Sequence, residues 1–214
     1  MNTNSLELVF ILDRSGSMSG LEHDTIGGFN GMIQKQRALE GDVRVSTVLF
    51  DDRFEVLHDR LPIETVAPLT TREYYVRGST ALLDAIGRSI RHVRKVRDKQ
   101  SAAERMSKVL FVITTDGMEN ASSEFSADYV KLLVERMQEK EQWEFLFLGA
   151  NIDAIATAER MGIRASRSAN YHADKKGIQR HYDTVSDAIM ELRVSASIQD
   201  DWKADLDKDF KDRK

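Results

Sequence analysis

The sequence predicts an α/β fold with a doubly wound, Rossmann-like sheet, mostly parallel, with one antiparallel edge strand and helices on both faces. Two observations support this prediction. Short apolar runs alternate along the chain with longer segments of helical periodicity. The loops between them are short, which favours crossovers within one sheet. With 214 residues, 41% of them hydrophobic, the chain can bury one substantial core, so we expect one domain over 1–199.

The expected strands are apolar runs bounded by turn residues. The turn at Asp51-Asp52 joins two such runs and predicts a hairpin, so the third strand should be antiparallel and lie at an edge. The run 109–114 is apolar throughout, which is typical of a strand covered on both faces. We expect strands at 6–12, 43–50, 53–57, 109–114 and 143–148, and a further edge strand near 166–169.

The expected helices lie between these strands. In one of them Leu82, Ile86 and Ile90 recur at helical spacing, which predicts a buried stripe. We expect helices at 21–39, 79–98, 127–140, 154–161 and 176–192. Glycines 27, 28 and 31 should permit close packing of the first helix. The segment 200–214 is almost all charged and has little to bury, so a charged C-terminal tail or a frayed helix is expected.

Three short motifs carry most of the chemical information. The segment 13–17 reads Asp-Arg-Ser-Gly-Ser and directly follows the first strand, while 115–117, Thr-Asp-Gly, follows the fourth. The segment 78–80, Gly-Ser-Thr, lies where the second helix begins. In a doubly wound sheet, ligands bind at the carboxyl ends of the strands, where the strand order reverses. We therefore expect the three motifs to meet there.

The side chains of these motifs suit a hard cation. Asp13 and Asp116 offer carboxylate oxygens. Ser15, Ser17 and Thr80 offer hydroxyl oxygens, a donor set that favours Mg²⁺, with Mn²⁺ and Ca²⁺ as alternatives. Alternate residues of an extended segment point the same way, so the first aspartate and the two serines can converge while the intervening residues, Arg and Gly, face elsewhere.

In these motifs the sequence resembles von Willebrand factor type A (VWA) domains, whose metal-ion-dependent adhesion site (MIDAS) has the same three parts. The resemblance covers nearly all of 6–195. It implies the VWA fold and a divalent cation, usually Mg²⁺, held directly or through water. It also implies that a Glu or Asp of a partner protein completes the coordination. The metal ligands implied in this sequence are Asp13, Ser15, Ser17, Thr80 and Asp116.

The closer resemblance is to small stand-alone bacterial cytoplasmic proteins of this family, through the segment 147–151, Phe-Leu-Gly-Ala-Asn. The chain shows no second recognisable domain, so neither an adhesive ectodomain nor a chelatase subunit is expected. The function implied is a non-enzymatic, divalent-cation-dependent protein-binding module whose partner protein exposes an Asp or Glu. The sequence does not name that partner and leaves the oligomeric state open.

Other interpretations of these motifs stay open. Singly, Asp13 could end a strand, Ser79 or Thr80 could cap a helix and Asp116-Gly117 could form a turn. The alternative function is a Mg²⁺-dependent phosphatase-like hydrolase with Asp13 as nucleophile. Proteins similar in that respect usually place a second Asp two residues later, where this chain has Ser15. The chain also lacks a nucleophile elbow, a phosphate-binding Gly-x-x-x-x-Gly-Lys loop and a strand-linked Gly-x-Gly-x-x-Gly.

Composition limits the compartment and the partners. The net charge of −4 gives no general attraction to nucleic acid or membranes, and the basic residues of 88–99 are expected to form the solvated face of a helix. The chain has no cysteine, and its polar start and broken apolar run show neither a signal peptide nor a membrane span. We expect a cytoplasmic protein that binds neither nucleic acid nor membrane.

Several residues are expected around the metal site without being ligands. Asp84 lies one helical turn after Thr80 and could steady the site or cap the helix. The histidines show no ligand spacing, so we expect all of them to be structural or surface residues. The loops around the metal, where partner contacts would occur, should carry Met18, Tyr74, Tyr75, Glu119 and Asn120.

Overall fold

The strands form one six-stranded sheet in the order β3-β2-β1-β4-β5-β6. The computed structural model describes residues 5–213, so the first four residues of the expected polar start and the last residue of the expected tail lie outside it. Only the β2–β3 pair is antiparallel, and β3 lies at an edge, as the hairpin predicted. The strands are β1 (Leu6–Asp13), β2 (Val43–Phe50), β3 (Phe54–Pro62), β4 (Lys108–Thr115), β5 (Glu144–Gly149) and β6 (Ser168–Asn170).

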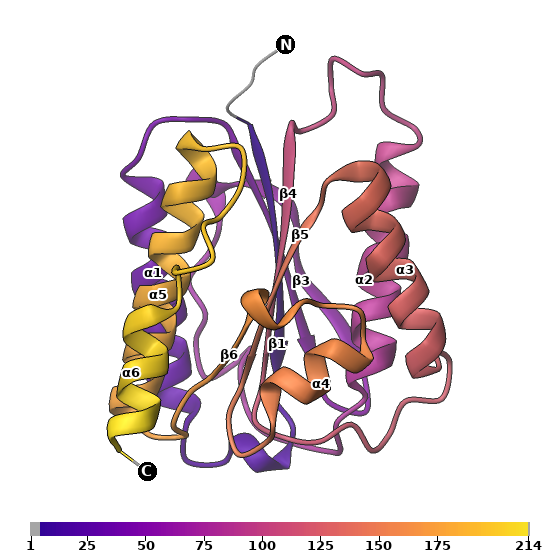
Figure 1. Cartoon of the computed structure of the whole chain (residues 1–214). Coiled ribbons are helices and arrows are strands. Elements are labelled where there is room, and N and C mark those ends of the chain that lie inside the picture. Colours follow the sequence, from indigo (N-terminus) through magenta and orange to yellow (C-terminus); the bar gives the residue numbers. More distant parts are fainter. Residues whose placement is uncertain (1–4, 214) are drawn as a thin grey trace.

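Helices cover both faces of the sheet (Figure 1). On one face lie α1 (Glu22–Arg37), α5 (Lys175–Val194) and α6 (Ala204–Asp212), and on the other lie α2 (Leu82–Arg97), α3 (Ala127–Glu141) and α4 (Ala154–Arg160). Short 3-10 turns cover Gly16–Met18, Ile63–Thr65 and Ala165–Arg167. This arrangement confirms the predicted doubly wound, mostly parallel α/β fold.

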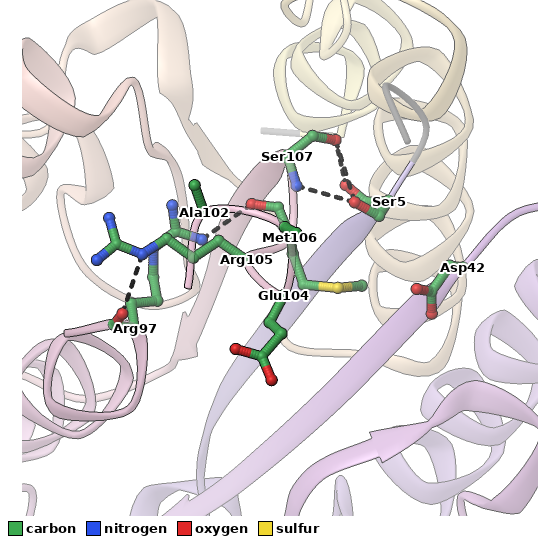
Figure 2. A pocket seen from close by; sticks show the side chains of 9 residues that line it. Ser5, Asp42, Arg97, Ala102, Glu104, Arg105, Met106 and Ser107 are labelled. Atoms are coloured by element: carbon green, nitrogen blue, oxygen red, sulfur yellow. Dashed lines mark hydrogen bonds between the residues drawn. The ribbon is translucent and has the colours of Figure 1, made fainter. Parts of the chain in front are cut away.

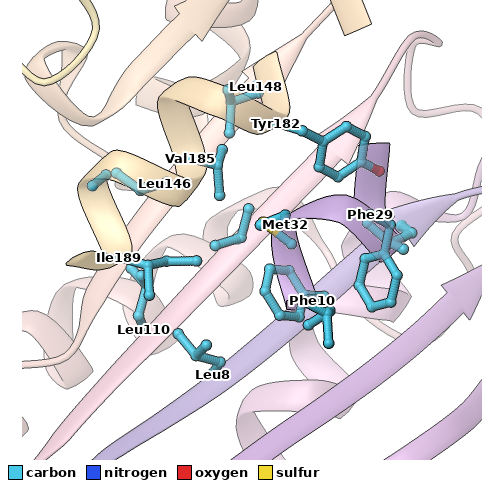
Figure 3. Packing of buried hydrophobic residues seen from close by; sticks show 14 of the residues in the cluster. Leu8, Phe10, Phe29, Met32, Leu110, Leu146, Leu148, Tyr182, Val185 and Ile189 are labelled. Atoms are coloured by element: carbon cyan, nitrogen blue, oxygen red, sulfur yellow. The ribbon is translucent and has the colours of Figure 1, made fainter. Parts of the chain in front are cut away.

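The central strands are buried on both faces. Along β1, Leu8 and Phe10 join the core under α1 and α5 (Figure 3), whereas Val9 and Ile11 join the core under α2 and α3. Successive side chains of a strand point to opposite faces, so a continuous apolar run supplies both cores. The position of β1 and β4 at the centre follows from this pattern.

One of the three glycines of α1 is where another helix comes close. A Cβ on Gly28 would lie 2.1 Å from the ring of Tyr182 in α5, whereas one on Gly27 or Gly31 would meet nothing within 4 Å. Close packing of α1 against α5 therefore depends on Gly28, and the prediction holds for that position alone.

The second helix begins later than predicted. The sequence placed its start near Ser79, but α2 begins at Leu82 because the residues before it have non-helical backbone, with Gly78 at φ +65° and Ala81 at ψ +61°. The backbone N–H groups of Thr80 and Ala81 donate instead to Asn120 and Asp51. The segment thus forms a loop that is bonded to its neighbours.

The charged C-terminal segment, expected as a tail or a frayed helix, contains α6, which packs on β6 and α5. Leu206 is buried, and Trp202 donates its indole N–H to the carbonyl oxygen of Ser166 at 2.7 Å. The buried Asp209 receives Lys176 and Arg180 from α5 at 2.8 and 3.0 Å. Leu206 and the ion pairs of Asp209 therefore hold a packed helix where a tail or a frayed helix was expected.

The strand order reverses between β1 and β4, because β2 lies on the far side of β1 and β5 lies on the far side of β4. The carboxyl ends of β1 and β4 are Asp13 and Thr115, so the two motifs that follow these strands emerge at the switch point. This is the place where sheets of this kind bind ligands.

Candidate functional site

The five predicted residues come together at the switch point. The hydroxyl of Thr80 donates to Ser15 Oγ at 3.0 Å, and Ser15 Oγ lies 3.1 Å from Ser17 Oγ. Ser17 in turn donates to Oδ1 of Asp116 at 2.5 Å. A chain of hydrogen bonds therefore links three loops separated by up to 99 residues in sequence.

Asp13 lies beneath this chain and is fully engaged with the protein. Its Oδ1 accepts the backbone N–H of Ser15 at 2.7 Å, and its Oδ2 accepts the hydroxyl of Thr115 at 2.5 Å. Burial raises the pKa of Asp13 to about 6 despite these hydrogen bonds. A nearby positive charge would favour the ionised form of this carboxyl group.

Asp116 is the carboxylate that lacks a full set of partners. Its Oδ2 is buried and has no hydrogen-bond partner in the described part of the chain. Burial also raises the pKa of Asp116. A buried polar atom without a partner is costly and calls for an explanation, of which a bound ion is one.

The donor set fits a hard divalent cation. Two carboxylates and three hydroxyls offer only oxygen, and two acidic groups balance one divalent charge. A Cβ on Gly117 would lie 2.9 Å from Ser17 Oγ and 3.0 Å from Thr80 Oγ1, so the absence of a side chain there leaves space between the hydroxyls. Within 5–213, no three His, Cys, Asp or Glu side chains group as a metal site.

A hollow of about 490 Å³, the carboxyl-end hollow, opens above these residues. Its lining includes Ser15, Ser17, Thr80, Asp116, Met118, Asn120 and Asn151. Of the ligand set, the two serines, Thr80 and Asp116 line the hollow directly. Asp13 lies below, consistent with its 1% exposure. The prediction that these five side chains converge is therefore met by the geometry.

Arg14 is the main residue that the sequence interpretation missed. As expected, it faces away from the carboxyl-end hollow, which it does not line. Its side chain is fully buried and pairs with Asp51 at 3.1 Å and Glu55 at 2.6 Å, which no local pattern indicated. It also donates to the carbonyl oxygen of Glu73 at 3.0 Å. Arg77 pairs with the same Asp51 at 2.6 Å. We call the loops that carry 13–17, Thr80 and Asp116 the first, second and third metal loops, after the metal that the sequence predicts. The buried arginine therefore ties the first metal loop to the β2–β3 turn, to β3 and to the loop before Thr80.

The charges around Asp51 hold that carboxylate ionised. Burial alone would raise its pKa, but hydrogen bonds from Arg77 and from the backbone of Arg53, with the charges of Arg77 and Arg14, lower it below its usual range. The sequence showed a turn at this position and gave no sign of an ion-pair cluster, because both arginines lie far from Asp51 along the chain.

The loop before Thr80 is bonded directly to the first metal loop. Gly16 donates its N–H to the carbonyl oxygen of Gly78 at 3.1 Å, and Arg77 donates to that of Arg14 at 2.9 Å. Gly78 has φ +65°, and a Cβ there would lie 2.0 Å from the carboxylate of Asp52. Only glycine fits this turn, which presents Thr80 to the serines.

The third metal loop is held by two carboxylates. Glu119 accepts the backbone N–H of Leu83 at 3.0 Å and that of Ser122 at 2.7 Å. Asp84 accepts the N–H groups of Ser123, Glu124 and Phe125, at 3.0, 3.0 and 2.9 Å. Asp84 therefore fixes the loop that follows Asp116, and it does not line the carboxyl-end hollow.

The residues expected around the metal have different roles. Met18 and Tyr74 are buried, and the Tyr74 hydroxyl donates to the carbonyl oxygen of Asp13. Tyr75 is 44% exposed, and its ring lies 5.4 Å from the guanidinium carbons of both Arg14 and Arg77. Asn120 lines the carboxyl-end hollow and is exposed, so it remains available for partner contacts.

A separate hollow of about 290 Å³, the amino-end hollow, lies at the start of β1 and β4 (Figure 2). It is lined by Ser5, Asp42, Arg97, Met106 and Ser107, among others. Ser107 and Ser5 bond one another, and Arg97 donates to the carbonyl oxygen of Met106. Its polar groups close a loop, and we assign it no ligand.

No protein-family model matches the sequence, and no curated protein sequence matches it. Solved structures resemble its fold. Proximal thread matrix protein 1 from the mussel byssus, with zinc occupying its MIDAS motif, has a TM-score of 0.57 at 15% identity. The match covers 86% of this chain and 45% of that protein, so the chain spans less than half of its length.

Two further structures belong to the same comparison. The vWF domain of the type V pili tip protein Mfa5 from Porphyromonas gingivalis has a TM-score of 0.61 at 10% identity. The match covers 94% of this chain and 100% of that domain. A von Willebrand factor type A structure from Catenulispora acidiphila has a TM-score of 0.56 at 13% identity, with 87% and 43% covered. At these identities the likeness concerns the fold, which is that of VWA domains.

None of the described helices, over 5–213, is long and apolar enough to cross a membrane.

Proposed function

We propose that this protein is a divalent-cation-dependent protein-binding module that captures an Asp or Glu carboxylate of a partner protein. The buried, unpartnered Oδ2 of Asp116, next to three mutually bonded hydroxyls, is the observation that carries the proposal. It supports a cation at this position. The zinc-occupied MIDAS motif of the mussel protein supports a divalent ion in a site of this type.

The residues that would hold the ion are Asp13, Ser15, Ser17, Thr80 and Asp116. Mg²⁺ is our proposed cation because the donors are all oxygen, and Mn²⁺ and Ca²⁺ are alternatives. When bound, such an ion supplies positive charge for an incoming carboxylate. The protein's own part is to hold the hydroxyls in place through the loop contacts at Gly78 and to keep the carboxyl-end hollow open.

The phosphatase-like alternative is less well supported. A nucleophilic aspartate must reach the phosphorus atom of its substrate, but Asp13 is 1% exposed and does not line the carboxyl-end hollow. Residue 15 is a serine, whose hydroxyl is a poor acid or base near neutral pH. A panel of aryl phosphates with Mg²⁺ tests this alternative, and turnover that is lost in Asp13→Asn would favour it.

The binding proposal is tested by partner capture. The full chain is immobilised in Mg²⁺, in parallel with a column in EDTA and a column of Asp116→Ala, and proteins retained from a lysate of the source cells are identified by mass spectrometry. We expect proteins that only the wild-type column with Mg²⁺ retains. Identical protein sets on all three columns would contradict the proposal.

The compartment and the type of protein are also proposals. The lack of cysteine supports a reducing compartment, and we infer a cytoplasmic protein of the small stand-alone bacterial type.

A further inference from the structure

An apolar hollow adjoins the carboxyl-end hollow. This side hollow has a volume of about 290 Å³ and is lined by Leu82 and Leu83 of α2, Ala127 of α3 and Met161 after α4. Thr157 and Arg160 of α4 complete its rim, with Met118 and Glu119 on the remaining side. An apolar cavity of roughly 150 Å³ accommodates a benzene ring, so the side hollow has room for a bulky side chain.

Two residues line both hollows, so the two hollows lie side by side. Met118 and Glu119 belong to the lining of the carboxyl-end hollow and of the side hollow. Met118 is 73% exposed and follows Asp116 by two residues. An exposed methionine forms an adaptable apolar contact surface. A chain segment with a carboxylate beside Asp116 would therefore pass Met118 before it reached the side hollow.

The wall between the hollows is preformed. Both oxygens of Glu119 accept hydrogen bonds, including those from the backbone of Leu83 and Ala121 at 3.0 Å each. The Ser122 hydroxyl also donates to Glu119, at 2.7 Å. Hydrogen bonds to a carboxylate are strong, so they fix the loop against the start of α2. Binding at the side hollow would then cost little ordering of the wall.

The charge at the rim favours an acidic occupant. Arg160 is exposed, and its side chain forms no ion pair or hydrogen bond with any residue of 5–213. The acidic group on the same rim, Glu119, is already bonded by several N–H groups. A free arginine beside an apolar hollow complements a segment that carries both a bulky apolar residue and a further acid.

We propose that the side hollow is the specificity subsite of this protein. It takes a bulky apolar side chain from an acidic segment of the partner, next in space to the carboxylate captured at the metal loops, with Arg160 facing a second acidic residue. This inference rests on the proposed function. It defines the partner as a segment that joins one acidic residue, one large apolar residue and further negative charge.

The test uses a random peptide library displayed on phage. The library is selected on the immobilised full chain in MgCl₂, and bound phage are eluted with EDTA. A selected peptide is then titrated against the wild type and variants. Ala127→Trp fills the side hollow, and Met118→Ser removes its exposed wall. Arg160→Glu reverses the charge at its rim. The control for Ala127→Trp is Leu132→Trp, at an exposed position of α3 outside the hollow. The control for Arg160→Glu is Arg136→Glu, on the same helix α3.

We expect the peptides eluted by EDTA to contain an acidic residue close to a bulky apolar residue. Ala127→Trp should weaken the selected peptide at least about 10-fold, which is the usual effect of losing one buried apolar side chain. Arg160→Glu should weaken it about 3-fold or more. Both controls should stay within about 2-fold of the wild type, and calorimetry should show unchanged Mg²⁺ binding in all variants.

Different outcomes would overturn different claims. The selection could yield acidic peptides without apolar enrichment, or Ala127→Trp and Met118→Ser could both bind the selected peptide as tightly as the wild type does. Either outcome would overturn the subsite and leave metal-dependent capture intact. A dimer that Ala127→Trp abolishes would show that a second copy of this chain covers the hollow, and would also overturn it. No EDTA-dependent peptide on the wild type would overturn the proposed function and the subsite with it.

Discussion

The two hollows at the ends of the parallel strands differ in how their polar side chains are bonded. At the amino-end hollow, Ser107 donates its N–H and its hydroxyl to Ser5, and Arg97 donates to the Met106 carbonyl (Figure 2). At the carboxyl-end hollow, the buried Oδ2 of Asp116 has no partner within the described residues. The bonds of the first hollow close a loop, whereas the second combines an unpartnered carboxylate oxygen with three hydroxyls.

The difference has an energetic meaning. Burial raises the pKa of Asp13 to about 6 and also raises that of Asp116, so the carboxyl end keeps two acidic groups where their charged forms are disfavoured. Folded chains usually avoid such an arrangement, and those that keep it do so at functional sites. The two ends can therefore be compared experimentally, by replacing matched residues at each end and measuring Mg²⁺ binding and stability.

The largest effect is expected from the carboxylate itself. Asp116→Ala should abolish Mg²⁺ binding because it removes the unpartnered oxygen, and Asp42→Ala, an exposed aspartate of the amino-end hollow, should leave binding unchanged. Calorimetric titration with MgCl₂ measures both, with circular dichroism to confirm folding. Equal Mg²⁺ affinity in the two variants would show that the two ends do not differ as claimed.

The next effect concerns the buried ion pairs beneath the carboxyl end. Arg14→Met should lower the free energy of unfolding by about 3–5 kcal/mol, because Asp51 would lose its fully buried partner. Arg105→Met, at an exposed arginine of the amino-end hollow, should change it by less than about 1 kcal/mol. Urea denaturation measures both. A small loss in Arg14→Met would mean that Arg77 alone holds Asp51.

The packing of α1 against α5 gives a smaller effect with an internal control. Gly28→Ala should destabilise the protein by about 1–3 kcal/mol, because its Cβ would lie 2.1 Å from the Tyr182 ring. Gly27→Ala, with nothing within 4 Å, should stabilise it by up to about 1 kcal/mol through helix propensity. Thermal unfolding compares the two. Equal shifts would refute the close approach of the helices.

The smallest effect is a pH dependence from His181, which lies under the carboxyl end, 3.2 Å from Thr114 Oγ1. Burial lowers its pKa from 6.5 to about 3, so between these values the unfolded chain binds a proton that the folded chain does not. Stability therefore falls as pH drops below 6.5, by about 1.4 kcal/mol per pH unit from this group.

The variant His181→Phe keeps a ring against Tyr171 and removes the titration. The loss of stability between pH 6.5 and 5.5 should then shrink by about 1 kcal/mol relative to the wild type, because the unfolded histidine is already half protonated at pH 6.5. His23→Gln, at an exposed position, should leave the pH profile unchanged. Parallel profiles for the wild type and His181→Phe would show that His181 becomes protonated in the folded protein.

The sheet and its ligand edge could be predicted because both depend on local sequence. Apolar runs define the strands, and Asp13 and Asp116 each follow a central one, so the carboxylates had to emerge together at the switch point. Arg14 could not be placed in this way, since its partners Asp51 and Glu55 meet it only through sheet pairing. Alternation along the loop correctly turned it away from the hydroxyls, but it could not show the partners that it meets there.

Other parts of the structure depend on tertiary contacts that no local pattern records. The start of α2 is delayed because Asn120 and Asp51 take the backbone donors of the preceding loop. The helix α6 forms in a highly charged segment because Leu206 and the ion pairs of Asp209 attach it to the sheet and to α5. The local pattern placed the start of α2 too early and did not show what the charged C-terminal segment packs against.

The most direct test of the central claim is the position of a bound cation. A crystal of the full chain soaked in MnCl₂ and measured at the manganese absorption edge would locate the ion from its anomalous signal. The account predicts one strong peak at the carboxyl ends of β1 and β4, in contact with Asp116 and the hydroxyls of Ser15, Ser17 and Thr80. A strong peak only elsewhere, or none at millimolar Mn²⁺, would contradict it.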